Sequence, residues 1–157
     1  MVEVPVLLTE LLSPDQIKIP LVGTSKDAVL DELIDVVADR GEVQDVSEIR
    51  RAVRDREEVL STGIGNGVAI PHGKSTGVDR LILTAGVTER PIDFEALDGQ
   101  PVSLFFLLVG PDSAAGQHVK ALSRISRLLR KESFRSRLCS AGSADEFYQV
   151  LEEAEAS

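Results

Sequence analysis

Residues 61–74 read Ser61-Thr62-Gly63-Ile64-Gly65-Asn66-Gly67-Val68-Ala69-Ile70-Pro71-His72-Gly73-Lys74, with three glycines within five positions. These glycines allow the backbone to adopt positive φ and to come close to another molecule. The apolar residues 68–70 predict a short strand, which is a rigid mount for a functional side chain. Pro71 has no N–H to donate, so the strand is expected to stop there and to leave His72 on the rim of a sheet. His72 is therefore the first candidate for chemistry.

Two nucleotide-binding motifs are similar to this stretch, and neither fits it. A dinucleotide fingerprint beginning at Gly63 needs a third glycine at position 68, which is Val68. A P-loop from Gly67 to Gly73 would have five residues between its glycines, where the motif has four. The stretch is thus not predicted to bind a nucleotide.

The composition predicts one domain over residues 1–157, long enough to bury a core without crosslinks. Hydrophobic residues make up 43% and aromatic residues only 4%, so the core is aliphatic. The net charge of −9 argues against nucleic acid as a partner. A single cysteine, Cys139, excludes an internal disulfide and favours a reducing, cytoplasmic location. No secretory signal begins the sequence and the longest apolar run, 104–109, is too short to cross a bilayer, so no membrane insertion is expected.

Helical and strand patterns alternate along the chain. Apolar spacing predicts helices over 7–12, from Ser25 to Gly41, from Ser47, over 114–131, over 134–138 and from Ser143, and strands over 17–19, 68–70, 81–88 and 102–109. Residues 102–109 are apolar at nearly every position, which is typical of a strand buried on both faces. Ser143 and Glu146 have the spacing of a capping box. The alternation predicts a layered α/β domain with helices on both faces of a mixed sheet.

Arg56 is the second candidate. In the helix from Ser47, the residues Ile49, Val53 and Arg56 follow one another at spacings of four and three. Such spacing keeps side chains on one face, so Arg56 is expected to end the buried stripe of this helix, within reach of the glycine run.

His118 allows two interpretations. It precedes Leu122, Ile125 and Leu129 on the apolar stripe of the helix over 114–131, so it faces inward. It could be a core histidine whose ring binds a backbone carbonyl. It also lies at the start of its helix, just past the buried strand, at the edge where α/β proteins collect ligands. In that case it shares one cleft with His72.

These residue types suit phosphoryl transfer. A neutral imidazole is a nucleophile at physiological pH and, when protonated, a good leaving group. The guanidinium of Arg56 and the hydroxyls of Ser61 and Thr62 are potential donors to phosphate oxygens near His72. A zinc site is the competing use of two histidines, but no cysteine or acid accompanies either at ligand spacing. A serine hydrolase would need a nucleophile elbow, which is missing. No metal and no cofactor are therefore expected.

Cys139 is the one other candidate nucleophile. Its apolar helical setting predicts a core residue rather than a phosphoryl acceptor.

Together the motifs resemble the enzyme IIA domain of the phosphoenolpyruvate-dependent phosphotransferase system, of the fructose, mannitol and nitrogen-regulatory type. The likeness runs from about residue 11 to residue 151, and its most specific part is the strand-mounted Pro71-His72 after the glycine run. The other segments that carry it are Arg56-Glu57-Glu58, residues 91–94, residues 97–102 and His118-Val119-Lys120. Gln117 stands where an acid is common in the family, and Val119 where leucine is usual.

The resemblance implies a three-layer α/β/α sandwich and a phosphocarrier. His72 matches the histidine that accepts a phosphoryl group on Nε2 from the carrier protein HPr and hands it to a cysteine of an enzyme IIB component. Arg56 matches the arginine that holds the phosphate, and His118 matches the second histidine of the site. The purpose stays open between sugar transport and regulation by phosphorylation-dependent binding. Pro91-Ile92-Asp93-Phe94 favours the nitrogen-regulatory branch, and residues 73–75 and 131–135 favour the fructose branch.

Overall fold

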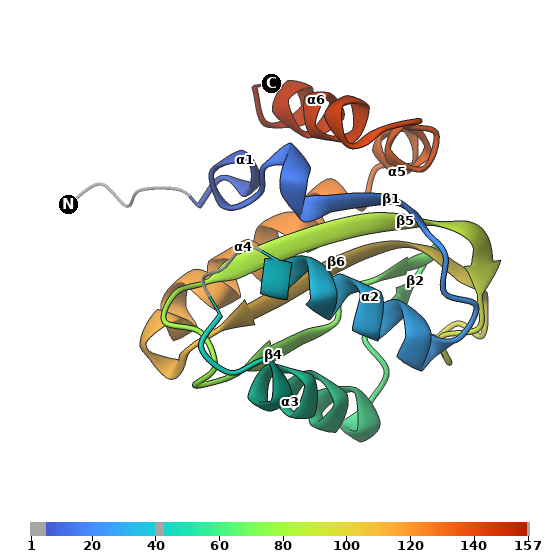
Figure 1. The fold of residues 1–157 in the computed structure, drawn as a ribbon. Helices are drawn as coiled ribbons and strands as arrows, with labels where there is room; N and C mark the ends of the chain where they lie inside the picture. Colours follow the sequence, from blue (N-terminus) through green and yellow to red (C-terminus); the bar gives the residue numbers. More distant parts are fainter. Residues whose placement is uncertain (1–5, 40–42, 157) are drawn as a thin grey trace.

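The computed structural model describes residues 6–39 and 43–156, and Figure 1 shows how their helices and strands are arranged. The helices are α1 (Leu8–Leu11), α2 (Lys26–Asp39), α3 (Val46–Val59), α4 (Ala115–Leu128), α5 (Glu132–Cys139) and α6 (Ala144–Ala156), with 3-10 turns η1 (Pro14–Gln16) and η2 (Asp112–Ala114). The strands are β1 (Ile17–Leu21), β2 (Gly63–Gly65), β3 (Val68–Ala69), β4 (His72–Lys74), β5 (Ile82–Ile92) and β6 (Val102–Gly110).

The strands form one mixed sheet in the order β1-β5-β6-β3-β2, with β4 also paired to β6. β1 runs parallel to β5, and β3 and β4 run parallel to β6. The pairs β5–β6 and β2–β3 are antiparallel. Between β2 and β3, Asn66 and Gly67 both have positive φ (59° and 77°), as a tight hairpin turn requires.

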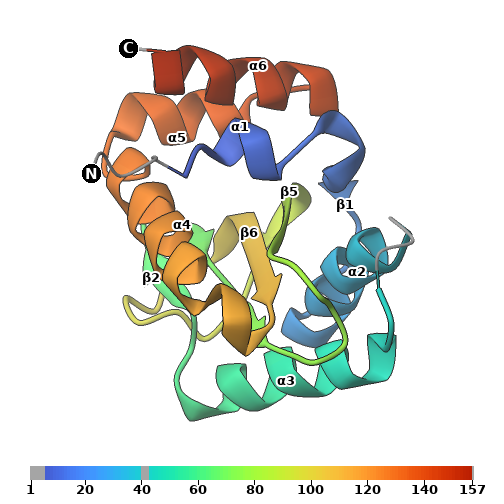
Figure 2. The ribbon, with the colours of Figure 1, turned by 90° about the vertical axis from the view of Figure 1, so that its left-hand side faces the viewer.

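The central strand β6 divides the core into two clusters. Its residues Leu104, Phe106 and Leu108 pack with buried residues of α1, α4, α5 and α6. Its residues Phe105, Leu107 and Val109 pack with α2 and α3 on the opposite face. Figure 2 shows these two groups of helices enclosing the strands. The predicted burial of this strand on both faces and the predicted α/β/α layering are therefore confirmed, because alternate side chains of one apolar strand serve two cores.

Two helices, α2 and α6, begin after the expected serine caps. Ser25 Oγ accepts from Ala28 N at 3.2 Å before α2, whereas the expected stop of this helix at Gly41 lies outside the described residues. Ser143 Oγ accepts from Glu146 N at 3.2 Å before α6, but the Glu146 carboxylate accepts from Gly142 N instead of completing a box with Ser143. In the described part of the chain, no helix combines the length and apolar character that crossing a membrane requires.

Pro71 interrupts the strand that carries the first histidine, but the sheet does not end there. β3 stops at Ala69, and pairing with β6 resumes in β4, where His72 lies opposite Leu108. The strand therefore stops before Pro71 as expected, but His72 is itself paired, in β4, instead of lying beyond the paired residues. Pro71 lacks an N–H, yet its carbonyl accepts from Leu108 N at 3.0 Å, so β6 continues through the break.

Candidate functional site

The two histidines of the chain lie against each other at one end of the sheet. Their ring centroids are 5.7 Å apart and the rings meet edge to face, at an interplanar angle of 70°. His72 comes from β4 and is half-buried, whereas His118 comes from the first turns of α4 and is 3% exposed. The chain leaves β6 at Gly110 and turns at once into η2 and α4, which brings His118 back over β4. The structure therefore has a shared histidine cluster rather than an isolated core histidine.

The ring of His72 is held in one tautomer. Its Nδ1 lies 2.9 Å from the carbonyl oxygen of Ile70. A carbonyl oxygen only accepts hydrogen bonds, so Nδ1 carries the proton and Nε2 keeps its lone pair. Burial is the largest influence on the pKa of His72 and lowers it, and the charge of Arg56 lowers this pKa further. The hydrogen bond to the Ile70 carbonyl and the charge of Glu57 act in the opposite direction and raise the pKa. The ring is consequently neutral and nucleophilic at neutral pH.

His118 is held neutral more strongly. Burial, followed by the influence of His72 and Lys74, lowers its pKa to about 4. Its Nδ1 is buried and has no hydrogen-bond partner among the described residues, so the carbonyl partner of a satisfied core histidine is missing. His118 is therefore not a core histidine whose ring is satisfied within the described part of the fold.

Arg56 approaches this cluster because α3 packs closely on β4. A Cβ at Gly73, the residue after His72, would lie 3.2 Å from backbone atoms of Ala52 and Val53, which is tighter than ordinary contact. Arg56 is half-buried, and its Nη1 donates to the carbonyl of Leu60 at 2.8 Å. Its charge is near enough to lower the pKa of His72.

Arg56 does not end the buried face of α3, as was expected; the next residue does. The position after Ile49 and Val53 on the buried face of α3 is occupied by Glu57, which is only 5% exposed. A spacing of four continues this face as well as a spacing of three does, so periodicity alone did not separate the two residues. Glu57 was missed as a candidate because a carboxylate is rarely buried without partners.

The hydroxyls of Ser61 and Thr62 are engaged within the protein. Ser61 Oγ donates to the carbonyl of Phe94 at 3.0 Å and accepts from Gly63 N at 3.1 Å. Thr62 is buried, and its Oγ1 donates to Glu57 at 2.5 Å. Neither hydroxyl has a hydrogen left to donate, so a phosphate-binding role for these side chains would require each to change its partner.

Cys139 lies on the surface of the protein. Cys139 is exposed at the end of α5, so its expected place in the core was wrong; Leu138 takes the buried position of that turn. Burial of the thiol by its neighbours nevertheless raises the pKa of Cys139, which keeps it protonated.

No group of three or more histidine, cysteine or acidic residues in the described ranges is arranged to hold a metal ion.

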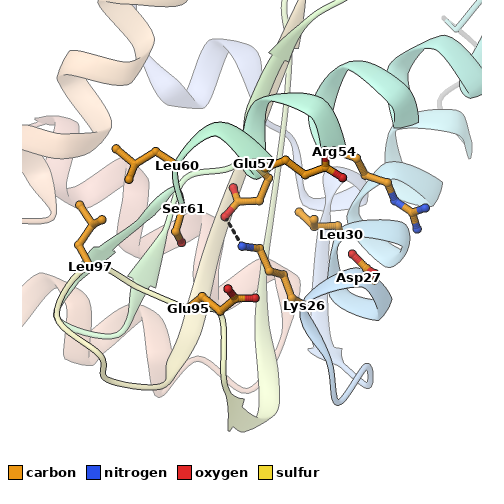
Figure 3. Close-up of a pocket in the computed structure, with 10 residues that line it drawn as sticks. Lys26, Asp27, Leu30, Arg54, Glu57, Leu60, Ser61, Glu95 and Leu97 are labelled. Carbon is orange, nitrogen blue, oxygen red and sulfur yellow. Dashed lines mark ion pairs between the residues drawn. The ribbon is translucent and has the colours of Figure 1, made fainter.

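A pocket of about 400 Å³ lies between the start of α2 and the end of α3, and neither histidine lines it. Figure 3 shows its side chains, among them the ion pair between Lys26 and Glu57, whose Nζ and Oε1 are 2.8 Å apart. Glu57, which lines this pocket, thus also accepts the hydrogen bond from the Thr62 hydroxyl.

The sequence matches the family model described as "Phosphoenolpyruvate-dependent sugar phosphotransferase system, EIIA 2" over residues 10–154. It is 39% identical over 144 residues to the "Nitrogen regulatory protein" of Bradyrhizobium diazoefficiens, and the match covers 92% of this chain and 94% of that protein. It is 37% identical over 144 residues to the "PTS system fructose-specific EIIABC component" of Bacillus subtilis, where 92% of this chain corresponds to only 23% of the longer protein.

Among solved structures, the fold is similar to that of the nitrogen regulatory protein IIA-Ntr from Neisseria meningitidis. The TM-score is 0.85 at 33% sequence identity, and the match covers 92% of this chain and 98% of the other.

Proposed function

Because the chain belongs to the EIIA type 2 family of the phosphoenolpyruvate-dependent phosphotransferase system, we propose that it is a phosphohistidine carrier. It accepts a phosphoryl group on Nε2 of His72 from an HPr-type carrier protein and passes it to a cysteine of an enzyme IIB component. The observation that carries this proposal is the contact between His72 Nδ1 and the Ile70 carbonyl, because it leaves the lone pair of Nε2 free to attack.

In the accepting step, the Nε2 lone pair forms a bond to phosphorus while the bond between phosphorus and the donor breaks, and its electron pair stays with the donor. The ring keeps its Nδ1 proton and becomes formally cationic, which makes it a good leaving group in the next step. A thiolate of the acceptor then attacks phosphorus, and the electron pair of the N–P bond returns to Nε2. His72 thereby regains its neutral, nucleophilic form.

Arg56 and His118 serve the transferred group. Arg56 uses one guanidinium nitrogen on Leu60, and its planar fork has further N–H groups for phosphate oxygens. His118 is neutral, and with Nδ1 buried its Nε2 is the nitrogen left to donate to a phosphate oxygen. Both donors act on charge that spreads over the equatorial oxygens during transfer.

The test is phosphorylation by a complete donor chain. Incubation with phosphoenolpyruvate, enzyme I and HPr should label the protein in an acid-labile, base-stable way, and His72→Ala should abolish the label. Cys139→Ser is the matched control and should label normally. Full labelling of His72→Ala would refute the assignment.

A second purpose is regulation rather than sugar uptake. This alternative is supported by the similarity to the nitrogen regulatory protein of Bradyrhizobium diazoefficiens, because the match covers 94% of that protein. The two purposes differ in the fate of the phosphoryl group. Passage from the labelled protein to the cysteine of a purified fructose-type IIB domain supports transport, whereas a stable label with binding of a regulatory partner in only one phosphorylation state supports regulation.

A further inference from the structure

Glu57 is a carboxylate in a position that the helix otherwise fills with apolar side chains. It is only 5% exposed and continues the face of Ile49 and Val53. Burial of an ionised group is costly unless other groups pair with it. Glu57 has such partners on two elements: Oε1 pairs with Lys26 Nζ at 2.8 Å, and the carboxylate accepts from both the N–H and the hydroxyl of Thr62.

A continuous path of hydrogen bonds leads from Glu57 to the proposed nucleophile. The backbone N–H of Thr62 donates to Glu57 Oε1 at 3.0 Å. The carbonyl of Thr62 accepts from the N–H of Ile70 at 3.0 Å. The carbonyl of Ile70 in turn accepts from His72 Nδ1 at 2.9 Å. Each residue on the path is therefore fixed by the one before it, and the first is fixed by a charged group.

We infer that Glu57 is a positioning residue for His72: it anchors Thr62, and through Thr62 and Ile70 it fixes the tautomer and orientation of the imidazole. The inference rests on the proposed function for the meaning of that orientation, but the path itself is a property of the fold. Lys26 completes the arrangement, because its ammonium balances the buried carboxylate (Figure 3). The ammonium also lies 4.8 Å from the centre of the Phe94 ring.

The charge of Glu57 adds to its mechanical role. During transfer the ring of His72 keeps the Nδ1 proton and becomes formally cationic. A carboxylate at the far end of the hydrogen-bond path favours that state, whereas the neighbouring Arg56 disfavours it. The same opposition acts on the free protein, where Glu57 raises and Arg56 lowers the pKa of His72.

The experiment compares Glu57→Gln with Glu58→Gln, the same substitution at the exposed next residue of the helix. Nitrogen-15 NMR of the imidazole reports the tautomer and the pKa of His72 without any phosphoryl donor. In Glu57→Gln we expect a lower pKa of His72 and faster solvent exchange of its Nδ1 proton. The rate of phosphorylation by HPr should fall ~10–100-fold, the range found when a group that orients a metal-bound histidine is lost. Glu58→Gln should match the unsubstituted protein in all three.

A second variant guards against simple unfolding, because Glu57→Gln leaves Lys26 without its counter-charge. Thr62→Val keeps the shape of the side chain and the backbone N–H but removes the hydroxyl bond to Glu57. It should also speed exchange of the Nδ1 proton, with a smaller loss of rate. An unchanged tautomer, pKa and exchange rate of His72 in a folded Glu57→Gln protein would overturn the inference, even if its melting temperature fell. Failure of the unsubstituted protein to be phosphorylated would instead refute the proposed function, and the NMR result would still decide the role of Glu57.

Discussion

His72 and His118 meet edge to face, with ring centroids 5.7 Å apart, and burial keeps both rings from carrying charge at neutral pH. Two neutral imidazoles can divide the work of transfer, one as nucleophile and the other as donor. Two charged rings at this distance would repel each other.

We expect His118→Gln to slow phosphorylation of His72 by ~10²–10³, the usual effect of losing one preorganised donor. Folding should survive, because the glutamine amide has polar groups in the same region and the buried Nδ1 that it replaces has no partner among the described residues. Transfer rates from HPr and thermal unfolding should be measured side by side, with the exposed neighbour Gln117→Asn as control. A normal rate on a destabilised protein would mean that His118 is structural.

Arg56→Lys keeps the charge but loses the planar fork that binds phosphate oxygens. We expect the transfer rate to fall ~10-fold, less than for complete loss of a donor. The melting temperature should stay nearly constant, since Arg56 is half-buried and lysine can still reach the Leu60 carbonyl. Arg54→Lys on the same helix, where the arginine pairs with Asp31, is the control and should transfer normally. A large loss of stability with normal transfer would contradict a role on phosphate.

The rate of phosphorylation should depend on pH through His72. Burial lowers its pKa below 6.5, so the ring is neutral, and the rate independent of its titration, at pH 7 and above. The rate should decline as the pH falls through this lowered pKa, because the protonated ring has no lone pair on Nε2. An NMR titration of His72 should have its midpoint where the rate declines. A midpoint above 6.5 would contradict the electrostatics described here.

Stability should also depend on pH, through His118. Its pKa is about 4 in the folded protein against an ordinary value of 6.5, so the unfolded chain binds the proton more readily. The folded protein is therefore most stable with respect to this group above pH 6.5, where the ring is neutral in both states. The free energy of unfolding decreases as the pH falls from 6.5 toward 4, because the unfolded chain takes up the proton first. His118→Gln should be less sensitive to pH in this window, as measured by urea unfolding at several pH values.

Glu155 links the two ends of the chain and should be a second source of pH dependence. Its carboxylate accepts from Leu8 N and Thr9 N, each at 2.9 Å, and pairs with Arg124. Burial alone would raise its pKa, but Arg124 and the two backbone donors lower it below 4.5. The stabilisation is therefore present at neutral pH and is lost as the pH falls through that lowered pKa.

Glu155→Gln should reduce the free energy of unfolding by ~1–3 kcal/mol at pH 7, because buried donors lose a charged partner. The exposed Glu152→Gln is the matched control and should have little effect. The difference between the two variants should shrink in acid, and a difference that stays constant with pH would show that the carboxylate charge is unimportant.

The layers of the fold could be predicted because β6 is apolar at nearly every position, which is typical of a strand covered by helices on both faces. His72 and His118 could each be found from local context. Their meeting could not, since it depends on how η2 turns the chain back after β6. The burial of Glu57 was not predicted, because apolar spacing defines the buried face of a helix only to within one residue. The same ambiguity led to the prediction that Cys139 is buried, whereas its neighbour Leu138 is the buried residue.

The break at Ile70 and Pro71 has one further consequence. Within an uninterrupted strand, successive carbonyls alternate between the two sides of the strand, and those facing a neighbour are taken up by the ladder. Here the Pro71 carbonyl takes the ladder bond from Leu108, and the Ile70 carbonyl turns to the imidazole two residues ahead. The backbone two residues before His72 thus decides which ring nitrogen carries the proton, and Thr62 in turn holds that backbone through the N–H of Ile70. The tautomer of the proposed nucleophile is therefore a property of the folded chain before any partner protein arrives.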